Sequence, residues 1–268
     1  MRVATILPHT SHDDTDRDRT LPRPPHVAYD HAAFFVDIDG TMIDFAPRPD
    51  EVFVDPELPV RLRTLWNRLD GALAMLSGRP LREIDALVHL PFAAAGGLHG
   101  SELRASDGSV LALPTDRAKL QPALERATAA AREAPGLLVE DKGGAIALHF
   151  REAPQTAPVA QRAAADMLRL AGPDFNLLQG NCVIELKRSD IDKGMALAAL
   201  MQTEPFKGRV PWMIGDDVTD EYAFDKANAL GGVSIIVGAR RPTCARYHLR
   251  DPAAARAWIA ELAGGESA

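Results

Sequence analysis

The sequence predicts an α/β protein in which a doubly wound parallel sheet carries an inserted α+β unit. Short apolar runs without alternation, each ending in acids or glycine, are separated by stretches of helical periodicity. Such runs are typical of strands buried on both faces of a parallel sheet. From about residue 136 to 187 the apolar residues instead alternate strictly with polar ones. That pattern indicates an antiparallel sheet with one covered face.

The chain begins with a segment that we expect to be a flexible tail. Residues 11–28 are rich in Asp, Arg and Pro and nearly free of branched apolar residues. Such a segment cannot bury enough apolar surface to offset the entropy that is lost on ordering. We therefore predict a flexible tail over residues 1–30.

The α/β core is predicted from five apolar runs and from the helical patterns between them. The predicted strands lie in AAFFVDIDG (32–40), ALAMLSG (72–78), FAAAGGLHG (92–100), WMIGDD (212–217) and VSIIVG (233–238). After the second run, Pro80 suits the first turn of a helix whose apolar stripe runs from Leu81 to Val88. KGMALAALM (193–201) is predicted to be helical as well. Strands that alternate with helices favour a doubly wound sheet.

The alternating segment is predicted to contain a hairpin and a helix. Two alternating stretches, 136–142 and 145–151, flank Gly143-Gly144, which is a two-residue hairpin signal. A helix is predicted in AQRAAADMLRLA (160–171). In CVIELK (182–187), alternation assigns one strand face to Cys182, Ile184 and Leu186 and the other to Val183, Glu185 and Lys187.

These patterns divide the chain into a core and an insertion. We place the α+β unit at residues 104–188, between the two parts of the core at 31–103 and 189–268. The length of 268 residues fits one or two domains, and 46% hydrophobic residues provide ample material for a core.

Composition excludes several classes of partner. Lys and Arg number 30 against 37 Asp and Glu, so the net charge of −7 argues against nucleic acid and anionic membranes. No stretch approaches the roughly 18 consecutive apolar residues of a membrane span, and the first residues do not resemble a signal peptide. Cys182 and Cys244 form neither a metal-ligand pair nor a disulfide framework. We therefore expect a cytoplasmic monomer that acts on a small molecule.

The strongest chemical signal is DIDGT (37–41), directly after the first buried run. In parallel sheets ligands bind beyond the carboxyl ends of strands, which is where Asp37 and Asp39 are expected. Two carboxylates beside a glycine turn suit a divalent cation and a carboxylate nucleophile. The alternative is that these acids merely form a turn or cap the next helix.

A second acidic group, GDDVTDE (215–221), follows the buried run VPWMI. Its four acids repel one another unless a cation or a basic partner neutralises them. Mg²⁺ is the expected cation, because it is hard, takes oxygen ligands and usually keeps several waters. Taken alone, the acids could also form a solvated helix start.

Two further segments carry groups that bind phosphate. LSGR (76–79) offers the Ser77 hydroxyl and backbone N–H groups at a strand end, and DKG (192–194) offers the Lys193 ammonium at a helix start. A lysine near a helix start is usually just a solvated residue. The order of these segments relative to the acids is what makes the pattern specific.

Taken in order, these motifs resemble those of the haloacid dehalogenase superfamily of phosphotransferases. Within it the chain resembles trehalose-6-phosphate phosphatases, over about residues 32–262. The closer resemblance rests on GLHGSE (97–102), EDKG (140–143), HFR (149–151), QG (179–180) with ELK (185–187), and GDDVTDE (215–221). It implies a Rossmann-like core with an inserted α+β cap.

The resemblance also implies a two-step phosphoryl transfer. Asp37 is the expected nucleophile and Asp39 the expected general acid and base. Mg²⁺ is expected on Asp37, the backbone carbonyl of Asp39 and Asp216, with Asp217 and Asp220 as supporting ligands or as groups that orient Lys193.

The remaining implied contacts are to the substrate. Phosphate oxygens are expected to be held by Thr41, Ser77, Gly78 and Lys193, and Lys193 is also expected to be catalytic. The sugar of a phosphorylated disaccharide is expected to contact Arg79, His99, Glu102, Glu140, Lys142, Arg151, Glu185 and Lys187. The alternatives are that the charged strand faces are only the wet side of a two-layer unit and that His99 is structural.

The leading interpretation is a Mg²⁺-dependent phosphatase that hydrolyses trehalose 6-phosphate. A sister enzyme for another phosphorylated sugar, such as sucrose phosphate or a glycosyl phosphoglycerate, is the nearest alternative. A non-catalytic protein that senses a sugar phosphate is a rival of another class, although Asp37, Asp39, Ser77, Lys193 and Asp216 are all present. A phosphomutase is a third, but nothing marks a site that returns phosphate to a second hydroxyl.

Overall fold

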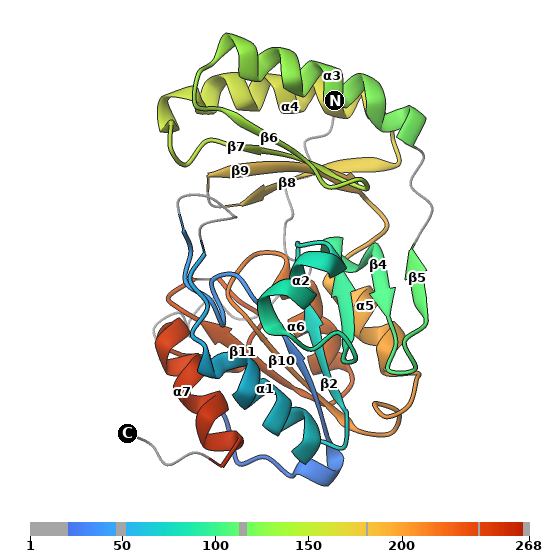
Figure 1. The fold of residues 1–268 in the computed structure, drawn as a ribbon, viewed down its shortest axis with the longest axis vertical. Coiled ribbons are helices and arrows are strands. Elements are labelled where there is room, and N and C mark those ends of the chain that lie inside the picture. Colours follow the sequence, from blue (N-terminus) through green and yellow to red (C-terminus); the bar gives the residue numbers. More distant parts are fainter. Residues whose placement is uncertain (1–20, 47–51, 113–116, 181, 241, 265–268) are drawn as a thin grey trace, which may run out of the picture.

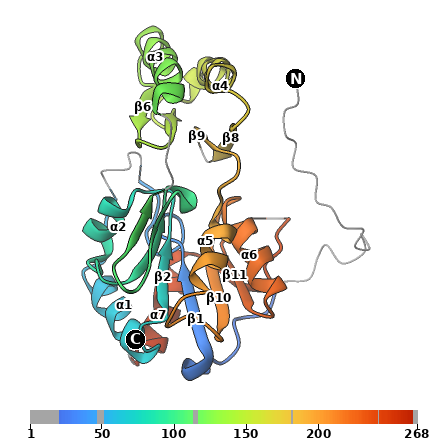
Figure 2. The same cartoon turned by 90° about the vertical axis from the view of Figure 1, so that its right-hand side faces the viewer.

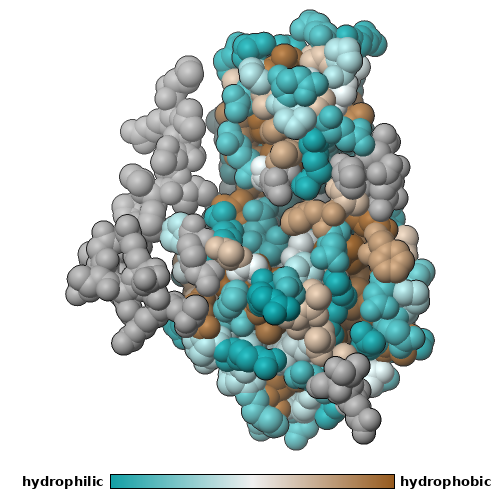
Figure 3. All heavy atoms as spheres, turned by 90° about the vertical axis from the view of Figure 1, so that its left-hand side faces the viewer, coloured by the Kyte–Doolittle hydropathy of each residue, from teal (hydrophilic) through white to brown (hydrophobic). Residues whose placement is uncertain are grey.

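The computed structural model describes residues 21–46, 52–112, 117–180, 182–240 and 242–264 (Figure 1). The described chain forms two lobes, a wide core and a narrower cap above it (Figure 3). Residues 1–20 of the predicted tail lie outside the described residues. No helix in the described ranges is long and apolar enough to cross a membrane.

The core contains an eight-stranded sheet with the order β12-β11-β10-β1-β2-β3-β4-β5. Its strands are β1 (Ala32–Val36), β2 (Leu73–Leu76), β3 (Ala94–Gly97), β4 (Glu102–Arg104), β5 (Val110–Ala112), β10 (Val210–Gly215), β11 (Val233–Val237) and β12 (Tyr247–Leu249). The strands from β12 to β3 are parallel, and β4 and β5 add an antiparallel edge.

Helices cover both faces of this sheet (Figure 2). On one face lie α1 (Glu57–Arg68), α2 (Leu81–Val88) and α7 (Pro252–Leu262), and on the other lie α5 (Lys193–Leu200) and α6 (Asp220–Ala229). All five residues of β1 are therefore buried, as expected for a central strand with both faces covered. The predicted doubly wound α/β class is confirmed.

The strand register determines where the active groups lie. Val36 of β1 pairs with Ile214 of β10, and the two strands run in the same direction. The residues after these strands therefore leave the sheet side by side at its carboxyl edge. This is why Asp37 and Asp216, although far apart in the sequence, become neighbours.

The cap is a two-layer unit with its own apolar core. Its antiparallel sheet has the order β6-β7-β9-β8, with β6 (Leu138–Asp141), β7 (Ile146–His149), β8 (Phe175–Gly180) and β9 (Val183–Arg188). The helices α3 (Arg117–Glu133) and α4 (Ala157–Ala171) cover the face that points away from the core lobe (Figure 1). Between the layers Leu148, Leu186 and Met167 are fully buried. The opposite sheet face is directed at the core.

Two predicted boundaries are wrong. Residues 104–112 belong to the core, because β4 and β5 pair at the edge of its sheet. Residues 21–30 are not a free tail, because Val27 is only 2% exposed in the core and the Pro22 carbonyl accepts a hydrogen bond from the backbone of His248. The few apolar residues of this segment suffice to dock it, which its polar composition obscured.

Candidate active site

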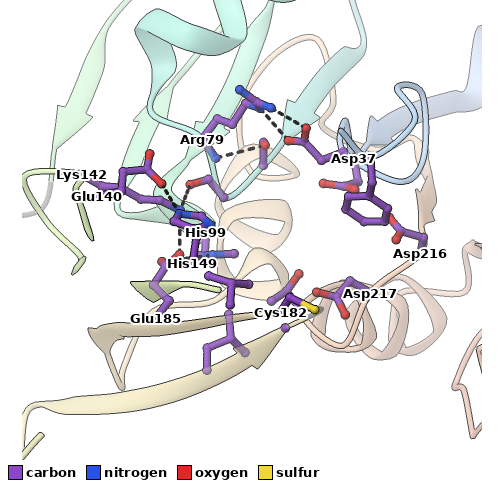
Figure 4. A pocket seen from close by; sticks show the side chains of 18 of the residues that line it. Asp37, Arg79, His99, Glu140, Lys142, His149, Cys182, Glu185, Asp216 and Asp217 are labelled. Atoms are coloured by element: carbon purple, nitrogen blue, oxygen red, sulfur yellow. Dashed lines mark hydrogen bonds and ion pairs between the residues drawn. The ribbon is translucent and has the colours of Figure 1, made fainter. Parts of the chain in front are cut away.

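A cavity of about 390 Å³ lies where the carboxyl edge of the core sheet meets the open face of the cap sheet. Its size is within the range of small-molecule sites. Both lobes contribute to its walls: Asp37, Asp216 and Asp217 lie at one end, and Glu140, Lys142 and Glu185 at the other (Figure 4).

Three carboxylates form the centre of the core end. Asp37 follows β1, Asp216 follows β10, and Asp220 begins α6; one oxygen of each lies within 4.8 Å of the others. Burial, together with the neighbouring negative charge, raises the pKa of Asp37 to about 7 and the pKa of Asp216 to about 9. Because the ionised forms are unfavourable when unneutralised, the cluster is suited to a divalent cation.

Lys193 neutralises part of this charge from the first turn of α5. Its Nζ donates to Asp37 Oδ1 at 2.6 Å and to Asp220 Oδ1 at 2.7 Å. Burial alone would lower the pKa of Lys193, but the charges of Asp220 and Asp37 outweigh it and raise the pKa. The helix begins here because the Asp192 side chain accepts from the backbone of Met195 and caps it.

Asp220 also builds the loop that carries Asp216. Its Oδ2 accepts from the backbone N–H groups of Asp216 and Asp217, each at 3.0 Å. With both oxygens bound and no exposed surface, Asp220 acts as a support that holds Lys193 and the loop. Asp217 lines the cavity, and its Oδ1 accepts from the backbone of Val218.

Thr41 and Gly40 fix the two central carboxylates. Thr41 Oγ1 lies 2.8 Å from Asp216 Oδ1 and 3.1 Å from Asp37 Oδ2, so its hydroxyl orients the carboxylates. Thr41 is fully buried and its hydroxyl contacts both carboxylates, so a contact with phosphate stays a prediction. Gly40 has φ +84°, and a Cβ there would lie 2.2 Å from Asp216 Oδ2. Only glycine allows this close approach.

Arg79 binds Asp39 rather than pointing freely at a sugar. Its Nε and Nη2 each donate to Asp39 at 2.7 Å in a bidentate pair. Burial opposes the charge of Arg79, but the bond to Asp39 outweighs it and raises the pKa of Arg79. The Arg79 backbone N–H donates to Ser77 Oγ at 3.1 Å. The arginine therefore connects the predicted acid/base group to the predicted phosphate loop.

On the cap side, charged groups pair across the open face of the sheet. Lys142 Nζ donates to Glu185 Oε2 at 2.7 Å and reaches the core, where it donates to the Gly78 carbonyl at 3.1 Å. His149 Nε2 lies 2.8 Å from Glu140 Oε2. Burial alone would raise the pKa of Glu185, but Lys142 outweighs burial and holds it well below its ordinary value. These contacts bring four charged or titratable side chains of the cap together over the open face of its sheet.

Two predicted sugar contacts lie elsewhere. Glu102 Oε2 accepts from the backbone N–H of Leu81 at 2.8 Å and so caps the start of α2. Lys187 Nζ donates to the carbonyls of Arg188 and Ile191, on the connection that returns from the cap to the core. Neither side chain lines the cavity. Lys187 was placed by strand alternation and Glu102 by its motif, and neither signal says where a long side chain finds its hydrogen-bond partners.

Two features of the cavity wall could not be predicted from the motifs. The guanidinium of Arg151 lies over the ring of Phe45, 5.2 Å from its centroid, and both residues line the cavity. Cys182 also lines the cavity, whereas alternation had assigned it to the covered face of Ile184. That prediction is wrong because Cys182 precedes the strand that begins at Val183 and has φ +60°, outside the extended conformation in which alternation applies. The tight spacing after Gly180 was the available signal.

Comparison with known structures identifies the fold. A haloacid dehalogenase-like hydrolase from Bacteroides thetaiotaomicron matches with a TM-score of 0.59 at 14% identity, over 87% of this chain and 99% of that one. The C-terminal domain of a trehalose-6-phosphate phosphatase from Candida albicans matches with a TM-score of 0.79 at 19% identity, over 92% and 99%. This protein therefore has the haloacid dehalogenase-like fold, here with an acidic cluster at the carboxyl edge of its sheet.

Sequence comparisons identify the family. The trehalose-phosphatase family profile matches residues 35–253. The chain is 43% identical over 211 residues to a probable trehalose-phosphate phosphatase of Sinorhizobium fredii, with 78% of each chain covered. It is 39% identical over 220 residues to the trehalose-6-phosphate phosphatase of Escherichia coli, with 81% of each covered. The chain belongs to the trehalose-phosphatase family, which confirms the resemblance predicted from its motifs.

Proposed function

We propose that this chain is a Mg²⁺-dependent phosphatase that hydrolyses trehalose 6-phosphate to trehalose and inorganic phosphate. The observation that carries the proposal is one cavity with two chemically different ends. The core end has a buried carboxylate beside a buried ammonium, Asp37 and Lys193. The cap end has hydrogen-bonding charged groups, such as Lys142 and Glu185, suited to sugar hydroxyls. The relatives named as trehalose-phosphate phosphatases support the same substrate.

Asp37 is the nucleophile in this mechanism. Its carboxylate attacks phosphorus in line and forms an aspartyl-phosphate, which divides one difficult displacement into two steps. A carboxylate and a phosphate charge repel by about 4 kcal/mol at 4 Å in an effective dielectric of 20. Lys193, 2.6 Å from Asp37 Oδ1, offsets part of that repulsion.

The donor set fits Mg²⁺. Asp37 and Asp216 are hard oxygen donors whose ionised forms are unfavourable as they stand, because both are buried near like charges. These carboxylates, with the backbone carbonyl of Asp39, would hold the ion. When bound, it supplies positive charge that stabilises the negative charge developing on the transferred phosphoryl group.

Asp39 is the general acid and base. It donates a proton to the departing sugar oxygen and later takes one from the water that attacks the aspartyl-phosphate. In the structure Arg79 holds the Asp39 carboxylate in one orientation at the cavity wall. Ser77 and the adjacent backbone would bind phosphate oxygens.

The cap selects the sugar. The open sheet face carries donors and acceptors within the same cavity as Asp37, and closure over the substrate would exclude bulk water. We propose a monomer in the cytoplasm: all these groups come from one chain, and both cysteines are free thiols, as in a reducing compartment.

The test is phosphate release from trehalose 6-phosphate by the wild-type protein. We expect Mg²⁺-dependent release of equimolar trehalose and phosphate, which a chelator abolishes and added Mg²⁺ restores. Asp37→Asn should be inactive, because an amide of nearly the same shape is a poor nucleophile. Release that is indifferent to chelation, or full activity of Asp37→Asn, would contradict the mechanism.

A further inference from the structure

His99 stands at the junction of the two lobes in an unusual backbone conformation. It follows β3 in the short 3-10 turn Leu98–Gly100. Leu98 and His99 have φ of +49° and +57°, and Gly100 has φ of +110°. Left-handed conformations in residues other than glycine cost free energy and are concentrated at functional sites. This turn brings the imidazole to the cavity wall, where His99 is 7% exposed.

The imidazole lies between the phosphate loop and the cap. A Cβ at Gly78 would lie 2.8 Å from the ring of His99, so loop and ring are in close contact. On the other side, His99 Nε2 lies 3.3 Å from Glu185 Oε1 (Figure 4). Lys142, also from the cap, holds the second oxygen of the same carboxylate at 2.7 Å. Glu185 thus has one cationic partner on its own lobe and one neighbour on the core.

Two buried polar atoms at this contact lack a hydrogen-bond partner. Among the described residues, Glu185 Oε1 and His99 Nδ1 are buried atoms without a hydrogen-bond partner. Buried polar atoms rarely remain unsatisfied in a functional state. Burial lowers the pKa of His99, although Glu185 opposes that shift. A neutral imidazole carries one proton, and Nε2 is the nitrogen that faces an acceptor.

We infer that His99 is a positioning residue that donates from Nε2 to Glu185 Oε1 and thereby aligns the cap's sugar-binding carboxylate with the phosphate loop of the core. The inference rests on the proposed function, since it assigns Glu185 to the sugar. Contacts of this kind are often long in the ligand-free state and tighten when substrate is bound. His99 then couples recognition of the sugar to the position of Ser77 and Gly78.

Two substitutions separate this role from a purely structural one. In His99→Gln the side-chain amide nitrogen can reach the position of Nε2, whereas in His99→Asn it reaches only that of Nδ1. Asparagine tolerates the left-handed backbone better than glutamine. A structural role therefore predicts that His99→Asn is the milder change, and the positioning role predicts that His99→Gln is.

The experiment measures kcat and KM of both variants with trehalose 6-phosphate and with an aryl phosphate, in saturating Mg²⁺. We expect His99→Asn to lower kcat/KM for trehalose 6-phosphate by about 10- to 100-fold, mainly through KM, the loss expected for a hydrogen bond to a charged group. The aryl phosphate lacks the sugar. For this substrate the fold-loss in kcat/KM should therefore be at least about fivefold smaller than the fold-loss for trehalose 6-phosphate. His99→Gln should recover most of the loss.

Equal losses on the two substrates, or a milder effect of His99→Asn, would overturn the inference. If His99→Gln is poorly folded, the readout is Glu185→Gln with and without His99→Asn; if His99→Asn is poorly folded, His99→Ala takes its place in that cycle. Non-additive losses in kcat/KM support the coupling between His99 and Glu185, and additive losses refute it. Wild-type turnover of trehalose 6-phosphate is measured in the same series, so failure of the proposed function is seen independently of His99.

Discussion

Replacing Lys142 by Met would remove the charge that holds Glu185 while keeping an unbranched side chain of similar length. Lys142 Nζ makes two hydrogen bonds, to Glu185 Oε2 at 2.7 Å and to the Gly78 carbonyl at 3.1 Å. The Lys142 and Glu185 side chains are 11% and 6% exposed, so the pair is screened little by solvent. Removing one partner of a buried ion pair costs about 3–5 kcal/mol, and one charged hydrogen bond to substrate is worth about 1.5–3 kcal/mol.

We therefore expect Lys142→Met to lower the free energy of unfolding by about 3 kcal/mol at pH 7. It should also lower kcat/KM for trehalose 6-phosphate by about 10- to 150-fold. In the wild type, the pKa of Glu185 is held below its ordinary value, so its stabilisation is complete above about pH 4.3 and is lost as the pH falls further. In the variant, burial raises that pKa instead. The difference in Tm between the two proteins should thus be largest at pH 7 and smaller at pH 5.

The assays are thermal unfolding at both pH values and phosphate release from trehalose 6-phosphate. Lys119→Met is the matched control, because Lys119 pairs with Asp174 on the cap surface at 2.7 Å with its side chain 49% exposed. Such a surface pair is worth less than about 1 kcal/mol. The double variant Lys142→Met, Glu185→Gln should be more stable than Lys142→Met at pH 7. A Tm difference that is the same at pH 7 and pH 5, or a control as damaging as the variant, would refute the reasoning.

Three further predictions concern other residues. Asp216→Asn should weaken activation by Mg²⁺, seen as a higher Mg²⁺ concentration for half-maximal activity; an unchanged titration would remove Asp216 from the cation site. Glu102→Ala should lower Tm by about 2–4 °C, since a lost helix cap costs about 1 kcal/mol, with kcat/KM within about twofold; a selective loss on the sugar phosphate would return Glu102 to the substrate site. Removing residues 1–28 should lower Tm by several degrees relative to removing 1–20, because burial of Val27 is worth about 1.5–3 kcal/mol; equal Tm values would mean that the docked segment contributes nothing.

The core of the site could be predicted because parallel strands impose a simple rule. Asp37 and Asp216 each follow a buried apolar run, and adjacent strands end at the same edge of the sheet. Lys193 was marked by its place at a helix start. The contacts of Arg79 and Thr41 did not follow from this rule, because a motif identifies residue types at an edge but not which oxygen each donor reaches.

The cap was less predictable for a different reason. Strict alternation indicated an open face, which carries Glu140 and Glu185, but it applies only while the chain stays in a strand. Cys182 turns at φ +60° and Lys187 folds onto backbone carbonyls where the strand leaves the sheet. The start of the cap after β5 also depends on tertiary pairing, since short strands carry little information about which sheet they join.

The most direct test of the central proposal is a comparison of phosphosugars under one set of conditions. The wild-type protein, with Mg²⁺, would be given trehalose 6-phosphate, sucrose phosphate, a glycosyl phosphoglycerate and glucose 6-phosphate, and kcat/KM would be measured for each. We predict the highest value for trehalose 6-phosphate, by at least about 10-fold, because loss of one charged sugar contact alone costs that much. A higher value for another phosphosugar, or no turnover of trehalose 6-phosphate, would contradict the proposal.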